Sequence, residues 1–304
     1  MSSEPGATPP LNANIRGILW ALLAMCAFAT VPVGVRILTP YLPSTEIVVL
    51  RNLIAVAFLV PWALKVGWVG VKPKRVGLHV MRGGLNGMGM ILWFWGLGLV
   101  PLANAVALQF TLPLFALLLA VLFLGERVGI RRTTAMAVGF MGALVIIRPG
   151  FIDVSLATSA ILLSAVFYAA TLVVMKTQSL NEKPMVIMFW SNLFIALFTL
   201  PPALFNWVSV PMEAWPWLVF LALGGWLAHY ALTKSLVTAE TKVVASLDFL
   251  RLPVVAFVAY PLFGEFPDAL TWVGAAIIAA ATTYIARRDA ALIDEGANTK
   301  NKEK

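Results

Sequence analysis

Ten long apolar stretches run through the sequence, and short segments that carry charges, proline or glycine separate them. A transmembrane helix needs about 20 mostly apolar residues, so stretches of this length indicate membrane spans. The predicted spans are residues 17–37, 46–64, 80–99, 102–124, 132–147, 156–175, 185–204, 214–233, 243–263 and 269–286. We therefore predict an all-α polytopic membrane protein with two polar tails. The tail at residues 1–14 is expected to be disordered, and a second tail covers residues 289–304.

The composition agrees with this fold class. Hydrophobic residues make up 61% of the chain and charged residues 12%, whereas a soluble domain has roughly 45–50% and about 25%. The net charge of +8 is spread too sparsely for a nucleic-acid partner, so the expected surroundings are a lipid bilayer. The single cysteine, Cys26, excludes a disulfide framework and a Cys-built zinc site. We predict no metal and no cofactor.

An internal repeat divides the spans into two sets of five. At an offset of 140, Asn52 aligns with Asn192 and Pro61 with Pro201, and at an offset of 139 the pair Gly125-Glu126 aligns with Gly264-Glu265. The predicted repeats are residues 15–150 and 151–288. Because each holds an odd number of spans, the second must be inverted in the membrane, an arrangement common in secondary transporters.

The basic residues test this topology independently. If ten spans begin on the cytoplasmic side, 18 of the 22 Lys and Arg residues lie in cytoplasmic loops and tails. Cytoplasmic loops carry an excess of Lys and Arg. We therefore predict that both termini are cytoplasmic.

Asp248 and Arg251 are the most unusual residues because both lie well inside the ninth predicted span. Their spacing places them on one helix face. Ionisable residues inside a membrane usually face a cavity or a partner. We favour a substrate-binding pair, with Asp248 also a candidate proton site. The alternative is a mutually neutralising pair that holds the helix to a neighbour.

Three other ionisable residues have weaker signals. Arg51, near the outer end of the second span, is a candidate for binding an anionic group. We slightly favour an interfacial position or a pair with Glu46. His229, deep in the eighth span, is a candidate proton site or a neutral helix contact, and both interpretations stay open. We expect His79 to be interfacial.

The third span combines small, amide and aromatic residues. Gly83 and Gly87 form a small-xxx-small face that permits close helix packing. Asn86 and Trp93 are seven residues apart and share another face. An aromatic wall beside an amide suits a planar or cationic organic ligand, and we favour this over an interfacial aromatic belt for Trp93.

Several repeat-equivalent positions are candidates for the central axis. Gln109 aligns with Asp248, and Phe110 aligns with Phe249. Equivalent positions in inverted repeats are expected to face a shared axis. The remaining features are the prolines within spans, Pro32, Pro113 and Pro253, which we expect to kink helices, and Glu126 and Glu265, which we expect to meet a partner such as the N-terminal amide of the next helix.

The sequence lacks the motifs of other function classes. It has no P-loop and no other nucleotide-binding motif, which argues against direct use of ATP. It has no HExxH or GxSxG motif, and only two histidines. We therefore predict that the protein is not an enzyme.

Taken together, these residues resemble the drug/metabolite transporter superfamily in its EamA-type branch, over about residues 15–288. The resemblance rests on the runs RGGLNGMGMILWFW, QFTLPLFALLLAVLFLGERVGIRR, GFMGALVIIRPG, DFLRLP, FGEFPDALTWVGAAIIAAA and YIARR. It implies a central cavity lined by the first, third, fourth, sixth, eighth and ninth helices. The candidate substrate-binding residues on these helices are Asn86, Trp93, Gln109, Tyr168, His229, Asp248 and Arg251.

The resemblance specifies the fold more strongly than the substrate. Members of this kind handle riboflavin, S-adenosylmethionine, metallophores or amino-acid metabolites. Two departures from the family pattern are Ala135, where glycine is common, and the one-residue shift of Pro253 relative to Pro113.

The resulting hypothesis is a secondary active transporter of a small polar, zwitterionic or aromatic metabolite, in a bacterial inner membrane, working by alternating access. Coupling to protons through Asp248 or His229, exchange without an ion, the direction of transport and a homodimer all stay open. The alternatives are a non-transporting accessory or sensor protein and a lipid-modifying membrane enzyme.

Overall fold

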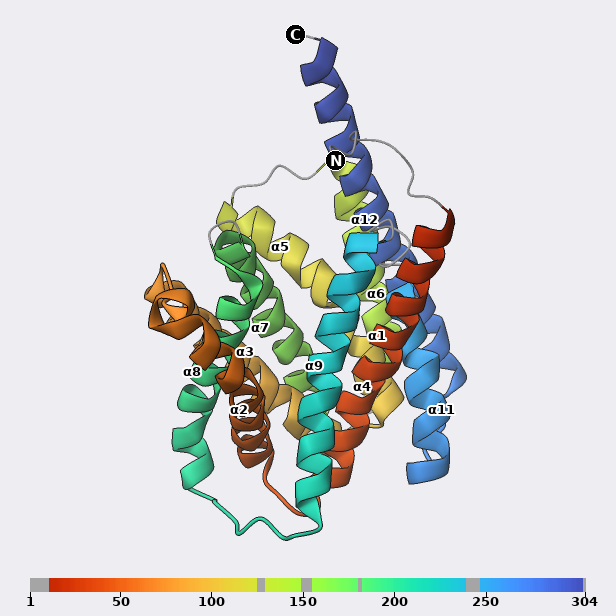
Figure 1. Ribbon diagram of the computed structural model, residues 1–304. Coiled ribbons are helices and arrows are strands. Elements are labelled where there is room, and N and C mark those ends of the chain that lie inside the picture. Colours follow the sequence, from red (N-terminus) through yellow and green to blue (C-terminus); the bar gives the residue numbers. More distant parts are fainter. Residues whose placement is uncertain (1–10, 125–128, 149–154, 180–181, 239–246, 303–304) are drawn as a thin grey trace.

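The computed structural model describes residues 11–124, 129–148, 155–179, 182–238 and 247–302, and these residues form helices and short connections (Figure 1). The elements are α1 (Leu11–Leu38), α2 (Ser44–Val71), α3 (Val76–Leu99), α4 (Leu102–Gln109), α5 (Leu112–Leu124), α6 (Ile130–Ile147), α7 (Leu156–Ser179), α8 (Pro184–Leu204), α9 (Ala214–Thr238), the 3-10 helix η1 (Asp248–Leu250), α11 (Arg251–Phe263) and α12 (Ala269–Lys302). The predicted all-α polytopic fold class is confirmed.

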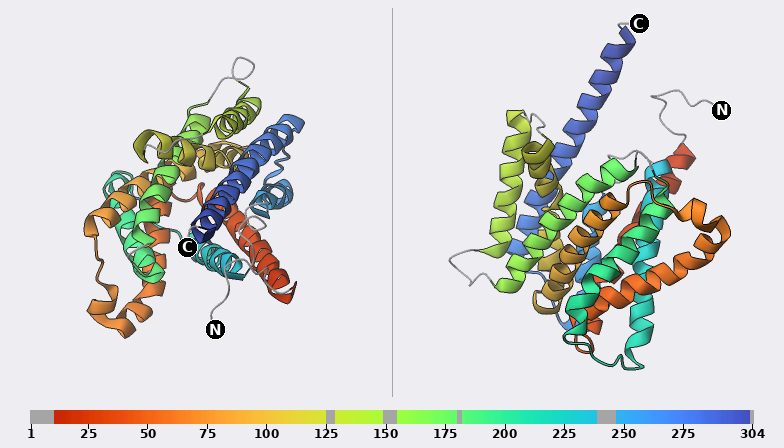
Figure 2. Two further views of the ribbon diagram at one scale, coloured as in Figure 1. Left: turned by 90° about the horizontal axis from the view of Figure 1, so that it is seen from above. Right: turned by 90° about the vertical axis from the view of Figure 1, so that its left-hand side faces the viewer.

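The helices follow the ten predicted spans, with two differences at the tails. α1 begins at Leu11, inside the predicted N-terminal tail, and residues 1–10 of that tail lie outside the described residues. α12 continues to Lys302, so the predicted C-terminal tail is helical up to that residue and extends beyond the rest of the bundle (Figures 1 and 2). α1 begins and α12 ends at the same end of the bundle, which we call the terminal end.

In the fourth and ninth spans the regular α-helical hydrogen bonding is interrupted by a short tight turn, which we call the break. α4 ends at Gln109 and α5 begins at Leu112, while η1 precedes α11 at the repeat-equivalent position. Pro113 and Pro253 lie in the first turns of α5 and α11, where a missing N–H costs no hydrogen bond. α1 continues through Pro32 instead.

At the first break the backbone is satisfied locally. The amide of Thr111 donates to the carbonyl of Leu108 at 3.0 Å, and its hydroxyl donates to the same oxygen at 2.7 Å. Irregular backbone at membrane depth is tolerated where it is buried in protein or lines a cavity. Thr111 is fully buried, so the break lies inside the bundle.

The two repeats pack against each other through an exchange of partners. α1 packs on α9 and α3 packs on α7, and these two contacts are equivalent when the repeats are interchanged. α2 packs on α8 and α6 packs on α12, each helix contacting its own counterpart. Asn52 and Asn192 also make the same bond, each donating at 2.7 Å to the carbonyl four residues earlier. These relations are those of two inverted five-helix repeats.

Glycines permit the close helix contacts. A Cβ added to Gly142 would lie 2.9 Å from the carbonyl oxygen of Gly274, and one added to Gly274 would lie 2.6 Å from that of Gly142. α6 and α12 therefore touch backbone to backbone. Gly83 and Gly87 face α8, where a Cβ at Gly87 would lie 3.0 Å from Thr199. The predicted small-xxx-small face of α3 is confirmed.

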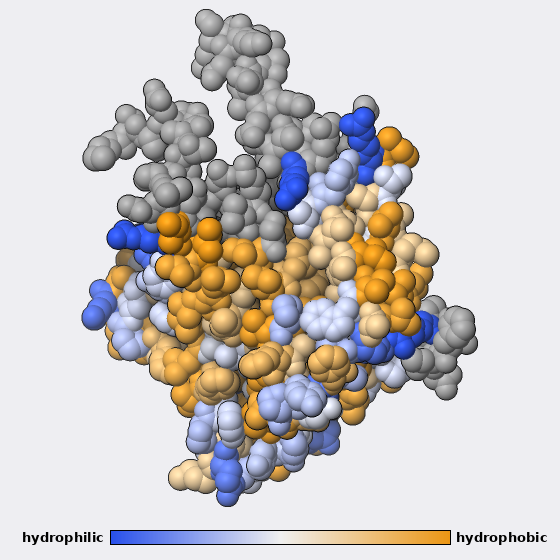
Figure 3. Space-filling view, turned by 90° about the vertical axis from the view of Figure 1, so that its right-hand side faces the viewer, coloured by the Kyte–Doolittle hydropathy of each residue, from blue (hydrophilic) through white to orange (hydrophobic). Residues whose placement is uncertain are grey.

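The outer surface of the bundle is largely apolar. Six described helical segments are long and apolar enough to cross a membrane: Ile15–Leu38, Ser44–Val71, Leu102–Leu122, Leu156–Met175, Pro184–Leu204 and Ala214–Ser235. Hydrophobic residues dominate the middle of the face in Figure 3, and hydrophilic residues gather mainly toward its margins. This is the distribution of a multi-pass membrane protein.

Candidate functional site

The broken fourth and ninth spans meet through a pair of aromatic rings. The centroids of Phe110 and Phe249 are 4.9 Å apart, and the ring planes are inclined by 67°. These residues occupy equivalent positions in the two repeats, so the prediction that such positions face a shared axis is confirmed for this pair. The contact brings the two breaks together at the centre of the bundle.

Arg251, in the first turn of α11, lies close to the ring of Phe110 and to a second ring, that of Phe28. Its guanidinium carbon lies 5.6 Å from the ring centroid of Phe28 and 5.3 Å from that of Phe110. A guanidinium at this distance from an aromatic face is stabilised by the ring quadrupole. Phe28 and Phe110 come from different helices, α1 and the α4–α5 break, and together they fix the position of the charge.

Asp248 and Arg251 are loosely associated. The closest approach of the carboxylate to the guanidinium is 4.0 Å, between Oδ2 and Nη2, and the side chain of Asp248 is 41% exposed. A pair whose role is to hold two helices together needs short, direct hydrogen bonds. The long separation leaves the carboxylate of Asp248 available to another cationic group.

His229 joins the same group of side chains from α9. Its ring lies 5.3 Å from that of Phe28 in a perpendicular arrangement. The side chain of His229 is exposed. The hydroxyl of Thr233, one turn later, donates to the backbone carbonyl of His229. Phe28 therefore contacts two of the predicted site residues, His229 and Arg251.

Arg51 does not form the predicted pair with Glu46. Glu46 is fully buried and accepts a hydrogen bond of 3.0 Å from the backbone amide of Val208. Arg51 instead donates from Nη1 to the sulfur of Met90 at 3.2 Å. Two residues five positions apart lie far apart around a helix, so the spacing itself argued against the pair.

The guanidinium of Arg51 also points into the bundle, toward α9. A Cβ added to Gly225 of α9 would lie 2.5 Å from its Nη2 atom. Tyr168 and His229 both lie within the long-range electrostatic field of Arg51, without a direct bond to it among the described residues. We call the following nine residues, linked by direct contacts or by this field, the central cluster: Phe28, Arg51, Met90, Phe110, Tyr168, His229, Asp248, Phe249 and Arg251.

The other predicted site residues lie on the helices that form the cluster. Gln109 is buried, and its side-chain oxygen accepts a hydrogen bond of 3.3 Å from Ser164. Trp93 is only 8% exposed and packs in the largest apolar core, so it does not belong to an interfacial belt. Asn86 lies on α3 one turn before Met90, and no hydrogen bond among the described residues joins it to the cluster.

Sequence reasoning missed Phe28 and Met90 as members of the cluster. Extending the offset of 140 to the first span aligns Phe28 with Tyr168, and this alignment is the signal that would have found Phe28. Met90 lies four residues after Asn86 on the same helix face. A methionine in an apolar run carries no signal by itself.

A polar cluster closes the end of the bundle opposite to the terminal end. Arg36 of α1 donates to the carbonyl oxygens of Gly98 at 2.9 Å and Val100 at 2.7 Å, and to the carboxylate of Glu265 at 2.7 Å. The second carboxylate oxygen of Glu265 accepts from the first amide of α4, that of Leu102, at 2.7 Å. We call these five residues the Glu265 clasp.

The clasp corrects the expectation for Glu265. Its partner is a helix N-terminal amide, as expected, but that helix is α4 of the other repeat and not the next helix, α12. Gly264, with a φ of 68°, turns the chain after α11 in the left-handed conformation that glycine adopts readily. Glu126 lies outside the described residues.

His79 has a buried structural partner that the sequence did not predict. It is fully buried near the terminal end, and its Nε2 atom lies 2.7 Å from the carboxylate of Glu182. The other oxygen of Glu182 accepts from the backbone amides of Lys74 at 3.0 Å and Arg75 at 3.2 Å. This pair ties the connection before α3 to the connection before α8.

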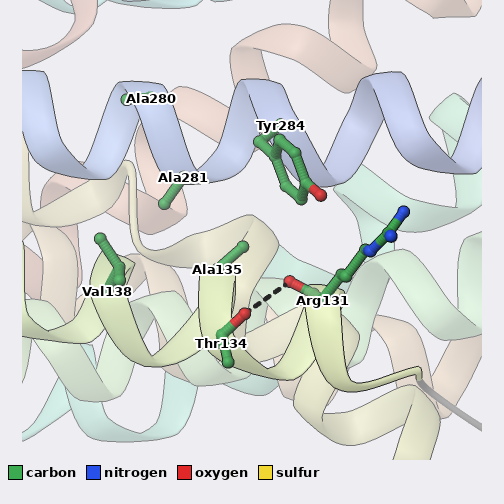
Figure 4. A pocket seen from close by; sticks show the side chains of 7 residues that line it. All are labelled: Arg131, Thr134, Ala135, Val138, Ala280, Ala281 and Tyr284. Carbon is green, nitrogen blue, oxygen red and sulfur yellow. Dashed lines mark hydrogen bonds between the residues drawn. The ribbon is translucent and has the colours of Figure 1, made fainter.

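A shallow groove lies elsewhere, between α6 and α12 (Figure 4). Its volume is about 310 Å³, and its lining consists of Arg131, Thr134, Ala135, Val138, Ala280, Ala281 and Tyr284. None of these is a predicted site residue. The groove is lined mostly by small and apolar side chains, in contrast to the charged central cluster.

Comparison with known proteins places the chain in a family. The model of the EamA-like transporter family matches it twice, at residues 15–148 and 155–287. The chain is 30% identical over 275 residues to the S-adenosylmethionine uptake transporter of Rickettsia prowazekii, covering 90% of this chain and 94% of that protein. It is 33% identical over 294 residues to the riboflavin transporter of Rhizobium johnstonii, covering 95% and 96%.

A solved crystal structure shares the fold. It has a TM-score of 0.59 and 20% sequence identity, and the match covers 91% of this chain and 98% of that one. The names of the family and of the relatives indicate a transporter and not an enzyme. The chain belongs to the EamA-like transporter family.

Proposed function

We propose that this protein is a secondary active transporter of a small zwitterionic or aromatic metabolite, with the central cluster as its substrate site. The observation that carries the proposal is the loose pair of Asp248 and Arg251 at the break of the ninth span. Discontinuous helices at the interface of inverted repeats are the usual place for substrate sites in transporters.

The composition of the cluster supports a ligand with both charged and flat parts. It offers one carboxylate, that of Asp248, for a cationic group. It offers the rings of Phe28, Phe110 and Phe249 for stacking. The relatives are named for S-adenosylmethionine and riboflavin, two compounds with a flat heterocycle and a polar chain. These compounds are the first candidates for this chain.

The Glu265 clasp supports alternating access. It joins α1, the α3–α4 connection and the α11–α12 connection, so it closes one end of the bundle across both repeats. We infer that this end opens when the clasp separates, and that the end carrying both termini opens in the other state. We further propose that the membrane is a bacterial inner membrane with both termini cytoplasmic, which the distribution of basic residues supports.

Counterflow in proteoliposomes tests the proposal. Vesicles containing the purified full-length protein are preloaded with unlabelled S-adenosylmethionine, riboflavin or an amino-acid metabolite, and uptake of the labelled compound is measured. We expect counterflow with at least one compound, and none with empty vesicles or with Asp248→Asn. Unchanged counterflow by Asp248→Asn and Arg251→Gln would refute the site.

Coupling is tested in the same vesicles. Proton coupling through Asp248 or His229 predicts that an imposed pH gradient drives net accumulation. Exchange without an ion predicts that the gradient changes nothing and that uptake requires internal substrate. His229→Gln separates the two candidate proton sites, because it removes gradient-driven uptake only if His229 carries the proton.

A further inference from the structure

Arg51 is a cation inside the bundle that no carboxylate of the described residues balances. Within those residues three arginines have a carboxylate at salt-bridge distance. They are Arg36, Arg148 and Arg251. Among the described residues, Arg51 donates a hydrogen bond to the sulfur of Met90, which is a weak acceptor. A buried charge without an ionic partner is costly and marks a functional site inside a membrane.

One edge of the guanidinium lacks hydrogen bonds. The Nε atom is buried and has no partner among the described residues, and the Nη2 atom has no hydrogen bond there either. These two atoms form the edge that binds a carboxylate side-on through two parallel N–H donors. Nη1, which contacts Met90, belongs to the other side of the group.

Gly225 lies directly beside this edge, because a glycine lets the guanidinium pack close to the backbone of its helix. A Cβ at position 225 would lie 2.5 Å from Nη2 and 3.6 Å from Nε. Any larger residue would therefore press on the two atoms that lack partners. Gly225 belongs to α9, the helix that also carries His229.

Arg51 lies beside residues already assigned to the proposed site. Tyr168 lies within the electrostatic field of Arg51, and a phenolic hydroxyl can donate a hydrogen bond to an anion. The central cluster as a whole holds two guanidinium groups, those of Arg51 and Arg251, and one carboxylate, that of Asp248. This excess of positive charge favours a ligand that brings an anionic group.

We propose that Arg51 binds a carboxylate of the transported compound through its Nε and Nη2 atoms, while Asp248 binds the cationic group. The substrate class is then a carboxylate-bearing zwitterion of the amino-acid type. Of the two first candidates this favours S-adenosylmethionine over riboflavin, which is neutral and has no carboxylate. This inference rests on the proposed function and adds a residue of α2, a helix outside the set that the family resemblance implies for the cavity.

Thermal unfolding of the purified full-length protein tests the inference without knowledge of the substrate. The probes are benzoate and benzamide, which have the same flat ring and differ in charge, compared at equal ionic strength. We expect benzoate to raise the unfolding midpoint of the wild type and benzamide to leave it unchanged. Arg51→Met should unfold at a higher temperature than the wild type without ligand, because it removes an unbalanced buried charge, and benzoate should no longer shift it.

Arg148→Met is the matched control, because Arg148 already has a carboxylate partner, Asp268, and lies outside the Glu265 clasp. It should unfold at a lower temperature than the wild type and keep the benzoate shift. The inference is overturned if benzoate does not shift the wild type, if benzoate still shifts Arg51→Met, or if Arg51→Met unfolds at a lower temperature without ligand.

Transport distinguishes this inference from the proposed function. S-adenosylmethionine and its decarboxylated form differ in the carboxylate, and only the first should show counterflow. Gly225→Ala should raise the KM of the carboxylate compound about tenfold or more, which corresponds to losing about one charge-assisted hydrogen bond. Counterflow by neither compound nor any other metabolite, with the benzoate shift intact, would contradict the transporter and leave the carboxylate site standing. Equal counterflow by both compounds would support the transporter and contradict the carboxylate site.

Discussion

The arginines at the closed end of the bundle and those at its centre are satisfied in different ways. At the closed end, Arg36 pairs with Glu265 and Arg148 pairs with Asp268, and each carboxylate also accepts a backbone amide. At the centre, Arg251 has two rings and a carboxylate 4.0 Å away, and Arg51 has a thioether. The first group has structural partners within the protein. The second group has only a weak or a distant partner, and this difference is the basis of our proposal that a substrate binds there.

The largest expected effect is at the centre. Asp248→Asn removes the only carboxylate of the central cluster and keeps its size. If it binds a cationic group of the substrate, the lost interaction of about 3 kcal/mol lowers apparent affinity about 100-fold. Counterflow measures the loss, and the unfolding midpoint should change little. A large fall in stability with retained transport would move Asp248 into the structural group.

The next effect is at the closed end. Arg36→Met removes three hydrogen bonds from a charged donor and leaves the carboxylate of Glu265 without its ionic partner. We expect the free energy of unfolding to fall by about 2 kcal/mol. Denaturant unfolding in detergent provides the measurement, with Glu265→Gln as the companion variant. An unchanged midpoint in both variants would show that the clasp contributes nothing to stability.

A smaller effect concerns the rings around Arg251. Phe110→Leu keeps an apolar side chain and removes one of two cation–π contacts. A contact worth about 1 kcal/mol predicts a roughly fivefold rise in KM. Phe115→Leu, a change on α5 at a ring that pairs with Phe140, is the control that should leave the KM unaltered. Equal effects of the two substitutions would argue against a specific role for the rings.

The smallest effect is at Asp268, before α12. Burial disfavours its charged form, but hydrogen bonds from Thr271 and Arg148 outweigh burial and lower the pKa of Asp268 below 3.8. Its charge therefore adds stability above the unfolded-state pKa, and this stability is lost as the pH falls through the lower folded-state pKa.

Two substitutions separate the charge of Asp268 from its hydrogen bond to the amide of Thr271. Asp268→Ala loses both and should cost about 1 kcal/mol near pH 7. Asp268→Asn keeps the bond and should cost less, and its difference from the wild type should vanish in acid. Thermal unfolding across a pH series provides the measurement, and a difference that grows toward low pH would contradict the assigned sign.

The spans were predictable because their signal is local. Length and apolarity define a membrane helix, and the repeat followed from matched positions such as Asn52 and Asn192. The break after Gln109 was not predicted, although Pro113 marks it, because a proline inside a membrane helix can also be accommodated without interruption, as at Pro32.

The partners of the charged residues were harder to predict because they come from the other repeat. His79 pairs with Glu182, which lies 103 positions later, and Glu265 pairs with Arg36, 229 positions earlier. For Arg51 the nearest carboxylate in sequence, Glu46, points to Val208 instead. No window along the chain contains these pairings, since they arise only when the two repeats interlock.

The exchange of partners between the repeats has a consequence for biosynthesis. α1 is made before its principal partner, α9, which belongs to the second repeat. The five spans of the first repeat, α1 to α6, must therefore stay in the bilayer with their glycine-lined faces uncovered until the second repeat is made. A chain truncated after α6 should consequently be recognised by membrane quality control and degraded, and not persist as a half-sized carrier.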